Sequence, residues 1–83
     1  MALRILLFTQ SGCLSCELMK IFLEAKEMVF EERNMSLDSA ARVELLETYH
    51  SHTAPTLVIF TAARAEVIEG FHPDRLDHLL SAA

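Results

Sequence analysis

The sequence predicts an α/β fold in which a four-stranded mixed sheet is flanked by helices on both faces. Two near-continuous apolar runs, residues 4–9 and 56–60, have the length and composition of strands that are covered on both sides. Other segments carry apolar residues at helical spacing, and the last of them begins at a proline. Because 83 residues can build one core and little else, we expect a single domain over residues 1–83.

The first half of the chain is predicted to form a strand, a helix and a second strand. Residues 4–9 are the first strand, and Gly12 marks the turn into a helix that runs from Cys13 to about residue 27. The apolar residues at helical spacing in this helix are Leu18, Ile21, Phe22 and Ala25. Residues 29–35 alternate only roughly, and we assign them to the second strand.

The second half is predicted to form a helix, a hairpin and a final helix. Ser36 or Asp38 can cap a helix that runs to about residue 50. The apolar residues on one side of this helix are Val43, Leu46 and Tyr49. The strand at residues 56–60 pairs with a short strand at residues 65–69. The final helix has Pro73 at its first position. Its inward residues are Leu76, Leu79 and Leu80. Right-handed crossovers make the first two strands parallel, which yields the order β-α-β-α-β-β-α.

Composition and charge exclude several classes of function. The net charge is −5 and the seven Lys and Arg residues are scattered, whereas nucleic-acid binding rests on clustered cations. No apolar run approaches the ~20 residues of a membrane span. The apolar opening at residues 3–8 is too short for a signal sequence. We therefore expect a cytoplasmic monomer that binds neither nucleic acid nor membrane.

Cys13 and Cys16 form a CxxC pair at the predicted turn from the first strand to the first helix. A disulfide between them would close too short a loop to stabilise the fold by chain entropy, so redox chemistry explains the pair better than a structural staple. Unpaired backbone N–H groups and the positive end of the helix dipole favour a thiolate at the helix N-terminus. We expect Cys13 to be exposed and to attack, and Cys16 to be more buried and to release the product.

A metal site is the main alternative use of these cysteines. Two of the histidines could complete a zinc site begun by the CxxC pair. The candidates are His50, His52, His72 and His78. The chain has no second CxxC, and the histidines lack the usual zinc-finger spacing, so we expect no metal. A redox-silent adaptor that uses the edge at Pro55 only to dock a partner is a further alternative.

Three stretches resemble the landmarks of the glutaredoxin family, and they occur in the same order. They are Phe8-Thr9-Gln10-Ser11-Gly12-Cys13-Leu14-Ser15-Cys16, Thr53-Ala54-Pro55 and Gly70-Phe71-His72-Pro73-Asp74. The resemblance covers essentially the whole chain and implies the thioredoxin fold. It also implies a cis Pro55, whereas the sequence alone favours an ordinary trans proline at a strand start. In this family the backbone of the residue before that proline pairs with the substrate as an added strand, which assigns the role to Ala54. The substrate-binding residues that the resemblance implies are Gln10, Leu14, Ser15, Thr53, Ala54, Pro55, Gly70, Phe71, His72 and Asp74.

Departures from the family pattern weaken the expected glutathione site. Leu14 and Ser15 replace the usual Pro and Tyr between the cysteines, and Gln10 replaces a Lys that would hold a glutathione carboxylate. Glu69 stands where a Gly-Gly pair usually begins and would bring a negative charge near a glutathione carboxylate. The Gly-Phe-x-Pro-Asp stretch is similar instead to glutaredoxin-like redoxins that take electrons from thioredoxin reductase and supply ribonucleotide reductase. Those proteins have a Trp where this chain has Ile68.

The sequence therefore predicts a thiol–disulfide oxidoreductase that carries electrons to protein disulfides, with no bound cofactor. The external electron donor is thioredoxin reductase or glutathione, and a ribonucleotide reductase is one acceptor that the resemblance suggests. Two alternatives use the same cysteines: a glutathione-dependent glutaredoxin, and a module that binds a metal or an iron–sulfur cluster.

Overall fold

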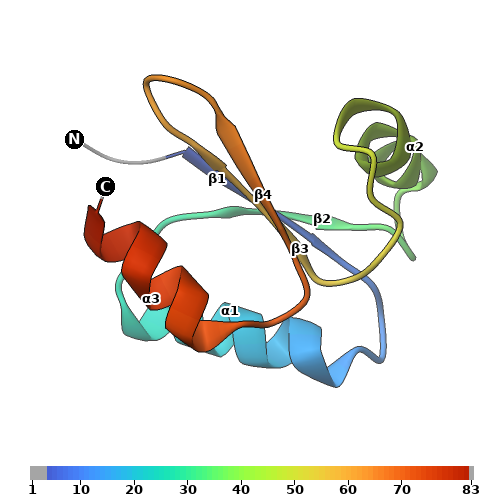
Figure 1. Ribbon diagram of the computed structural model, residues 1–83. Coiled ribbons are helices and arrows are strands. Elements are labelled where there is room, and N and C mark those ends of the chain that lie inside the picture. The colour runs from blue at the N-terminus through green and yellow to red at the C-terminus, as the bar shows by residue number, and fades with distance from the viewer. Residues whose placement is uncertain (1–3, 83) are drawn as a thin grey trace.

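The computed structural model describes residues 4–82, and the side chains of residues 4–80. The elements are β1 (Arg4–Thr9), α1 (Leu14–Ala25), β2 (Glu31–Asn34), α2 (Ser39–Thr48), β3 (Thr56–Phe60), β4 (Ala65–Glu69) and α3 (Pro73–Ala82). This order confirms the predicted arrangement, which is that of the thioredoxin fold (Figure 1).

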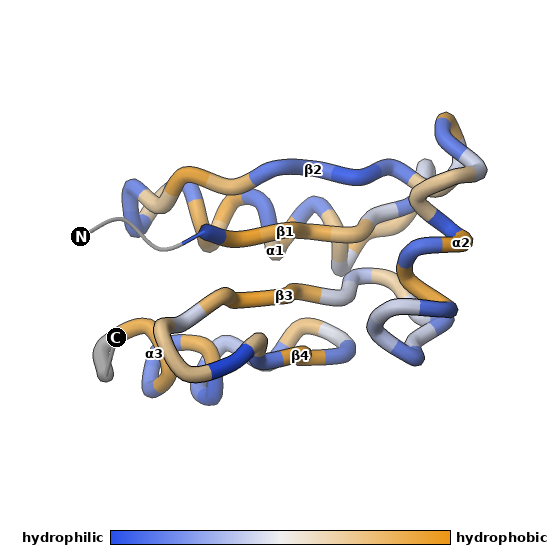
Figure 2. The backbone as a smooth tube through the Cα atoms, turned by 90° about the horizontal axis from the view of Figure 1, so that it is seen from above, coloured by the Kyte–Doolittle hydropathy of each residue, from blue (hydrophilic) through white to orange (hydrophobic). Residues whose placement is uncertain are grey.

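The strands form one sheet of four in the order β2-β1-β3-β4. The pair β1 and β2 is parallel, as the crossover rule predicts, while β3 is antiparallel to both β1 and β4. The central strands β1 and β3 are apolar along most of their length, and the edge strand β2 is hydrophilic (Figure 2). The most hydrophobic strands are thus the ones covered on both faces.

Helices cover both faces of the sheet and divide the core in two. On one face, Met19 and Leu23 of α1 and Leu76 of α3 pack against inward residues of β1 and β3. On the other face, Ala41 and Leu45 of α2 pack on a second cluster (Figure 1). Leu79 and Leu80 lie partly buried against the first cluster, as predicted for the inner side of the last helix.

The apolar residues at helical spacing in α1 are not the ones that the fold buries most, although Phe22 packs against the first cluster. Leu18 is 41% exposed and Ile21 is 60% exposed, whereas Cys16, Met19 and Leu23 are fully buried. A helix turns by 100° per residue, so Leu18 and Ile21 lie on the side opposite the buried residues. Apolar residues recur at helical spacing on both sides of α1, and the sheet contact selects the side that buries Cys16.

The apolar side predicted for α2 is also partly wrong. Val43 and Leu46 are about half exposed, and Ala41 and Leu45 are the buried residues. Tyr49 does lie half-buried, with its ring 5.7 Å from that of Phe8. Of the two predicted caps, the structure uses the second: the side chain of Asp38 accepts the backbone N–H of Ala40 at 3.0 Å.

Strand β2 is shorter than predicted, because the chain is still leaving α1 at one end and turns sharply at the other. The N–H of Met28 donates to the carbonyl of Leu23, and the next residue, Val29, is 84% exposed. At the far end, the side chain of Asn34 accepts the N–H of Ser36 at 2.8 Å, which turns the chain away from the sheet.

Over the described residues, no helix is both long enough and apolar enough to cross a membrane.

Candidate active site

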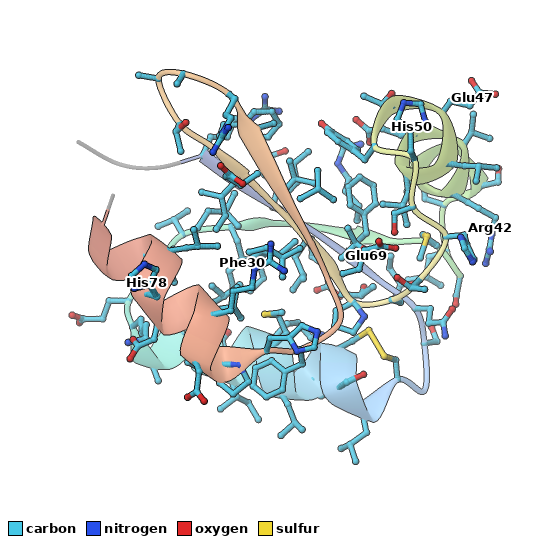
Figure 3. All side chains as sticks on the ribbon, in the orientation of Figure 1. Phe30, Arg42, Glu47, His50, Glu69 and His78 are labelled. Atoms are coloured by element: carbon cyan, nitrogen blue, oxygen red, sulfur yellow. A yellow bond between two sulfur atoms is a disulfide. The ribbon has the colours of Figure 1, made fainter. Side chains whose placement is uncertain are left out.

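The CxxC pair lies where β1 gives way to α1. Gly12 has a φ of +73°, a left-handed conformation that glycine adopts freely, and it reverses the chain between strand and helix. Cys13 is the N-cap of α1, and Cys16 lies in its first turn. The two sulfur atoms are joined in a disulfide, with Cα atoms 5.2 Å apart (Figure 3). The structure is therefore that of the oxidised protein.

Two hydrogen-bond donors point at the sulfur of Cys13. The backbone N–H of Cys16 donates to Cys13 Sγ at 3.1 Å, which is the N-cap bond of the helix. The hydroxyl of Ser15 lies 3.5 Å from the same sulfur, and a disulfide sulfur has no proton, so this hydroxyl is the donor. Both donors face the atom that becomes negatively charged when the disulfide is reduced and Cys13 ionises. The helix N-terminus adds a partial positive charge at the same place.

The two cysteines differ in burial in the predicted direction. Cys16 is 1% exposed and belongs to the core, whereas Cys13 is intermediate rather than fully exposed. A partner's sulfur can thus approach Cys13 first. The roles of attacking and resolving thiol remain predictions that this difference supports.

The loop before β3 brings Ala54 and Pro55 to the disulfide. The Ala54–Pro55 peptide bond is cis, as the family resemblance implied and the sequence alone did not favour. The carbonyl oxygen of Ala54 lies 4.0 Å from Cys13 Sγ. The carbonyl of Pro55 accepts the backbone N–H of Gly70 at 2.7 Å, which fixes the loop to the end of β4. The structure therefore gathers Cys13, Ala54 and Gly70, which are far apart in sequence, at one edge of the molecule.

A cluster of hydroxyls and one carboxylate holds this loop from the other side. Ser51 is 1% exposed, and its hydroxyl donates to Glu69 Oε2 at 2.8 Å. The hydroxyl of Thr53 donates to the same oxygen at 3.2 Å. Thr56 Oγ1 donates to the carbonyl of Thr53 at 2.7 Å. The predicted site residue Thr53 thus has both its side chain and its backbone bonded within this cluster, because its N–H also donates to the Ser51 hydroxyl at 3.5 Å.

Sequence reasoning missed Ser51 altogether, and it read Glu69 only as a charge. Their hydrogen bond joins residues 18 positions apart in the chain. The density of hydroxyl residues at 51, 53 and 56 was the one signal available, and hydroxyl-rich loops are common in proteins without such a role.

The remaining predicted site residues make no hydrogen bond to the disulfide. Gln10 and Leu14 are exposed on either side of Cys13 along the chain. Phe71 packs edge-on against Phe22 with ring centres 6.0 Å apart, so its ring belongs partly to the core. His72 and Asp74, with Phe71, line an open pocket at the start of α3, and neither cysteine lines that pocket.

The hypothesis of a metal site finds no ligand set in the structure. Within the described side chains, no three His, Cys, Asp or Glu residues are arranged to hold a metal ion. Figure 3 shows His50 beside α2 and His78 on α3, at opposite ends of the molecule. His50 and His78 therefore lie too far apart to be ligands of one metal ion.

Comparison with known proteins assigns the family. The glutaredoxin family model matches residues 5–61, a stretch that contains both cysteines, the Ala54–Pro55 bond and β3. The chain belongs to the glutaredoxin family. No curated protein sequence matched the chain.

Solved structures agree with this family. The chain is similar to the thioredoxin-like protein BC3987, with 36% identity, a TM-score of 0.79, and coverage of 90% of this chain and 97% of that one. A mutant of the same protein gives 34% identity, a TM-score of 0.80, and coverage of 92% and 97%. The glutaredoxin from Archaeoglobus fulgidus is 17% identical with a TM-score of 0.77, over 92% of this chain and 84% of that one, which shows a shared fold.

This glutaredoxin-family member is, in general terms, a thiol–disulfide oxidoreductase domain with Cys13 and Cys16 as its redox pair. The site can hold a thiolate at a helix N-terminus, and a second thiol lies within bonding reach of it. Beside that thiolate lies an edge of free backbone at Ala54. Thiol–disulfide exchange proceeds by attack of a thiolate on a disulfide sulfur, and the site supplies the attacking and the resolving sulfur.

Proposed function

We propose that this protein is an electron carrier that reduces disulfides in other proteins and is itself reduced by thioredoxin reductase. The observation that carries the proposal is the position of Cys13 Sγ. This sulfur is the more accessible of the pair, accepts the Cys16 N–H at 3.1 Å, and lies 4.0 Å from the Ala54 carbonyl. A partner segment that pairs with the Ala54 backbone would hold its own disulfide against this atom.

The exchange has two steps. In the first, the Cys13 thiolate attacks one sulfur of the partner's disulfide, forms a mixed disulfide, and expels the partner's other sulfur as a thiolate. In the second, Cys16 loses its proton to solvent and its thiolate attacks Cys13 Sγ, which releases the partner's remaining thiolate. The partner gains two electrons, and this protein is left with the Cys13–Cys16 disulfide, the form seen in the structure. A reductase then returns two electrons and restores the dithiol.

The surroundings of the site favour a protein reductase over glutathione as the donor. Glutathione carries two carboxylates at neutral pH, and a site that binds it benefits from cations. Across the described residues, no Lys or Arg forms a hydrogen bond or ion pair with Cys13 or with the hydroxyl cluster around Thr53. The carboxylate of Glu69 lies there instead, 3.2 Å from the Thr53 hydroxyl. We propose protein disulfides, such as that of a ribonucleotide reductase, as acceptors, and the cytoplasm as the compartment.

A comparison of donors tests this proposal. Reduction of insulin is followed with NADPH and thioredoxin reductase, and in parallel with NADPH, glutathione and glutathione reductase. We expect turnover with the first system to exceed that with the second, and Cys13→Ser to abolish both. Faster turnover with glutathione would make the protein a glutathione-dependent glutaredoxin. No turnover with either donor, from protein shown to carry two free thiols after reduction, would overturn the electron-carrier proposal.

A further inference from the structure

The carboxylate of Glu69 is a negative charge bonded to the loop that carries Ala54, the residue whose backbone is proposed to pair with a substrate. Glu69 is exposed as a residue, yet its Oε2 atom accepts the hydroxyls of Ser51 at 2.8 Å and Thr53 at 3.2 Å (Figure 3). Thr53 precedes Ala54, whose carbonyl lies 4.0 Å from Cys13 Sγ. The Glu69 carboxylate is therefore bonded to Thr53, the residue next to Ala54, and the carbonyl of Ala54 faces the reacting sulfur.

Among the described residues, no cation pairs directly with this carboxylate. The ion pairs of these residues join other groups. Its two donors are hydroxyls, which orient a carboxylate and leave its charge in place. The net charge of −5 adds a long-range field of the same sign.

We propose that Glu69 makes the site selective for disulfides that are flanked by Lys or Arg in the partner. This inference rests on the proposed function, and it names the class of substrate. A peptide paired with the Ala54 backbone would lie about 4.8 Å from the loop, the ordinary spacing of neighbouring strands. The residue next to its cysteine would then pass Thr53, within reach of the Glu69 carboxylate.

The expected size of the effect follows from Coulomb's law. Two unit charges about 6 Å apart in water change a rate or equilibrium constant by about threefold. A lysine beside the peptide's cysteine raises the reaction rate by this factor, and a glutamate there lowers it by the same factor. We therefore expect peptides with lysine to react roughly tenfold faster than peptides with glutamate. Because the carboxylate is held by Ser51, its distance from the docked chain stays within a narrow range.

The test uses synthetic peptides of sequence Ala-X-Cys-X-Ala, oxidised to symmetrical disulfides, with X as Lys, Gln or Glu. Pre-reduced protein is mixed with each peptide at pH 8, and the second-order rate constant of peptide reduction is measured. The measured quantity is the ratio of the Lys rate to the Glu rate. The same ratio is measured for Glu69→Gln and for the control Glu66→Gln. Glu66 lies on the same strand, and its carboxylate pairs with Arg64 at 2.6 Å.

The proposal predicts a ratio near ten for the natural protein, a drop of at least threefold in Glu69→Gln, and little change in Glu66→Gln. Salt at 1 M should also reduce the ratio, because the screening length falls to about 3 Å. A ratio near one, or a high ratio that survives in Glu69→Gln, would overturn the inference. If Glu69→Gln merely loosened the loop, all three peptides would slow equally and the ratio would persist. If no peptide were reduced, the proposed function would fail rather than this selectivity.

Discussion

Replacing Ser51 by alanine removes the side chain that ties the loop before β3 to the end of β4. Ser51 has a single hydroxyl proton, and this proton goes to Glu69 Oε2 at 2.8 Å. Thr56 gives its own proton to the carbonyl of Thr53 at 2.7 Å. Neither hydroxyl therefore has a proton to donate across the 3.0 Å contact between Ser51 and Thr56, so this contact contributes little to the free energy of unfolding.

The main loss in Ser51→Ala is thus one hydrogen bond to a charged acceptor. Such bonds contribute about 1.5–3 kcal/mol net to the free energy of unfolding. Glu69 is exposed, so water partly replaces the lost donor, and we expect a loss of about 1.5 kcal/mol. For a chain of this size, that loss corresponds to a fall in Tm of about 6–12 °C.

Urea unfolding of the oxidised protein, with and without the substitution, measures this difference. Ser36→Ala is the control, because its exposed hydroxyl accepts a single backbone N–H from Ser11, and we expect a loss within about 0.5 kcal/mol. If Ser51→Ala cost no more than Ser36→Ala, the hydroxyl cluster would not be what holds the loop in place.

Two further predictions concern the fold. Leu23→Ala should reduce the free energy of unfolding by about 2–5 kcal/mol and Leu18→Ala by less than about 1 kcal/mol, because only Leu23 is buried. Denaturant unfolding of the two variants measures these losses. Equal losses would mean that α1 presents another side to the sheet. Burial, and to a lesser extent the nearby charge of Glu44, raises the pKa of Tyr49 above its ordinary value of 10.0. The unfolded chain then releases this proton first, so stability is unaffected below pH 10 and falls as the pH rises beyond it. Tyr49 is the single tyrosine of the chain, so absorbance near 295 nm follows its ionisation alone, and an unshifted titration in the folded protein would reject the prediction.

The order of the elements could be predicted because its signals are local. Apolar runs, helical spacing, Gly12 and Pro73 each act within a few residues of the chain. Which side of a helix is buried depends on the tertiary contact instead. In α1, Met19 and Leu18 are both apolar and adjacent, and only the sheet decides that Met19 is buried. The same limit applies to α2, where Val43 shares an apolar side with Tyr49 in the sequence and is half exposed in the structure.

In the candidate site, too, the features within one turn of chain could be predicted, and the contacts between distant residues could not. Cys13 and Cys16 share one turn of helix, so their position and their order of burial followed from spacing and from the strand-to-helix turn. The nearness of Ala54 to Cys13 Sγ joins residues 41 positions apart, and only the family resemblance pointed to it. The bond from Ser51 to Glu69 depends on how the loop meets β4, which no local pattern in the sequence records.

Trapping of the mixed disulfide tests the central claim most directly, namely that Cys13 attacks and Cys16 resolves. Reduced Cys16→Ser and Cys13→Ser proteins are each mixed with a peptide disulfide, and the products are resolved by mass spectrometry with the modified residue identified after proteolysis. We expect Cys16→Ser to accumulate a stable mixed disulfide at Cys13, because the buried thiol that would release it is gone. We expect Cys13→Ser to react far more slowly, because the remaining thiol is 1% exposed. Accumulation of a mixed disulfide at Cys16 in Cys13→Ser, with none at Cys13 in Cys16→Ser, would contradict the claim.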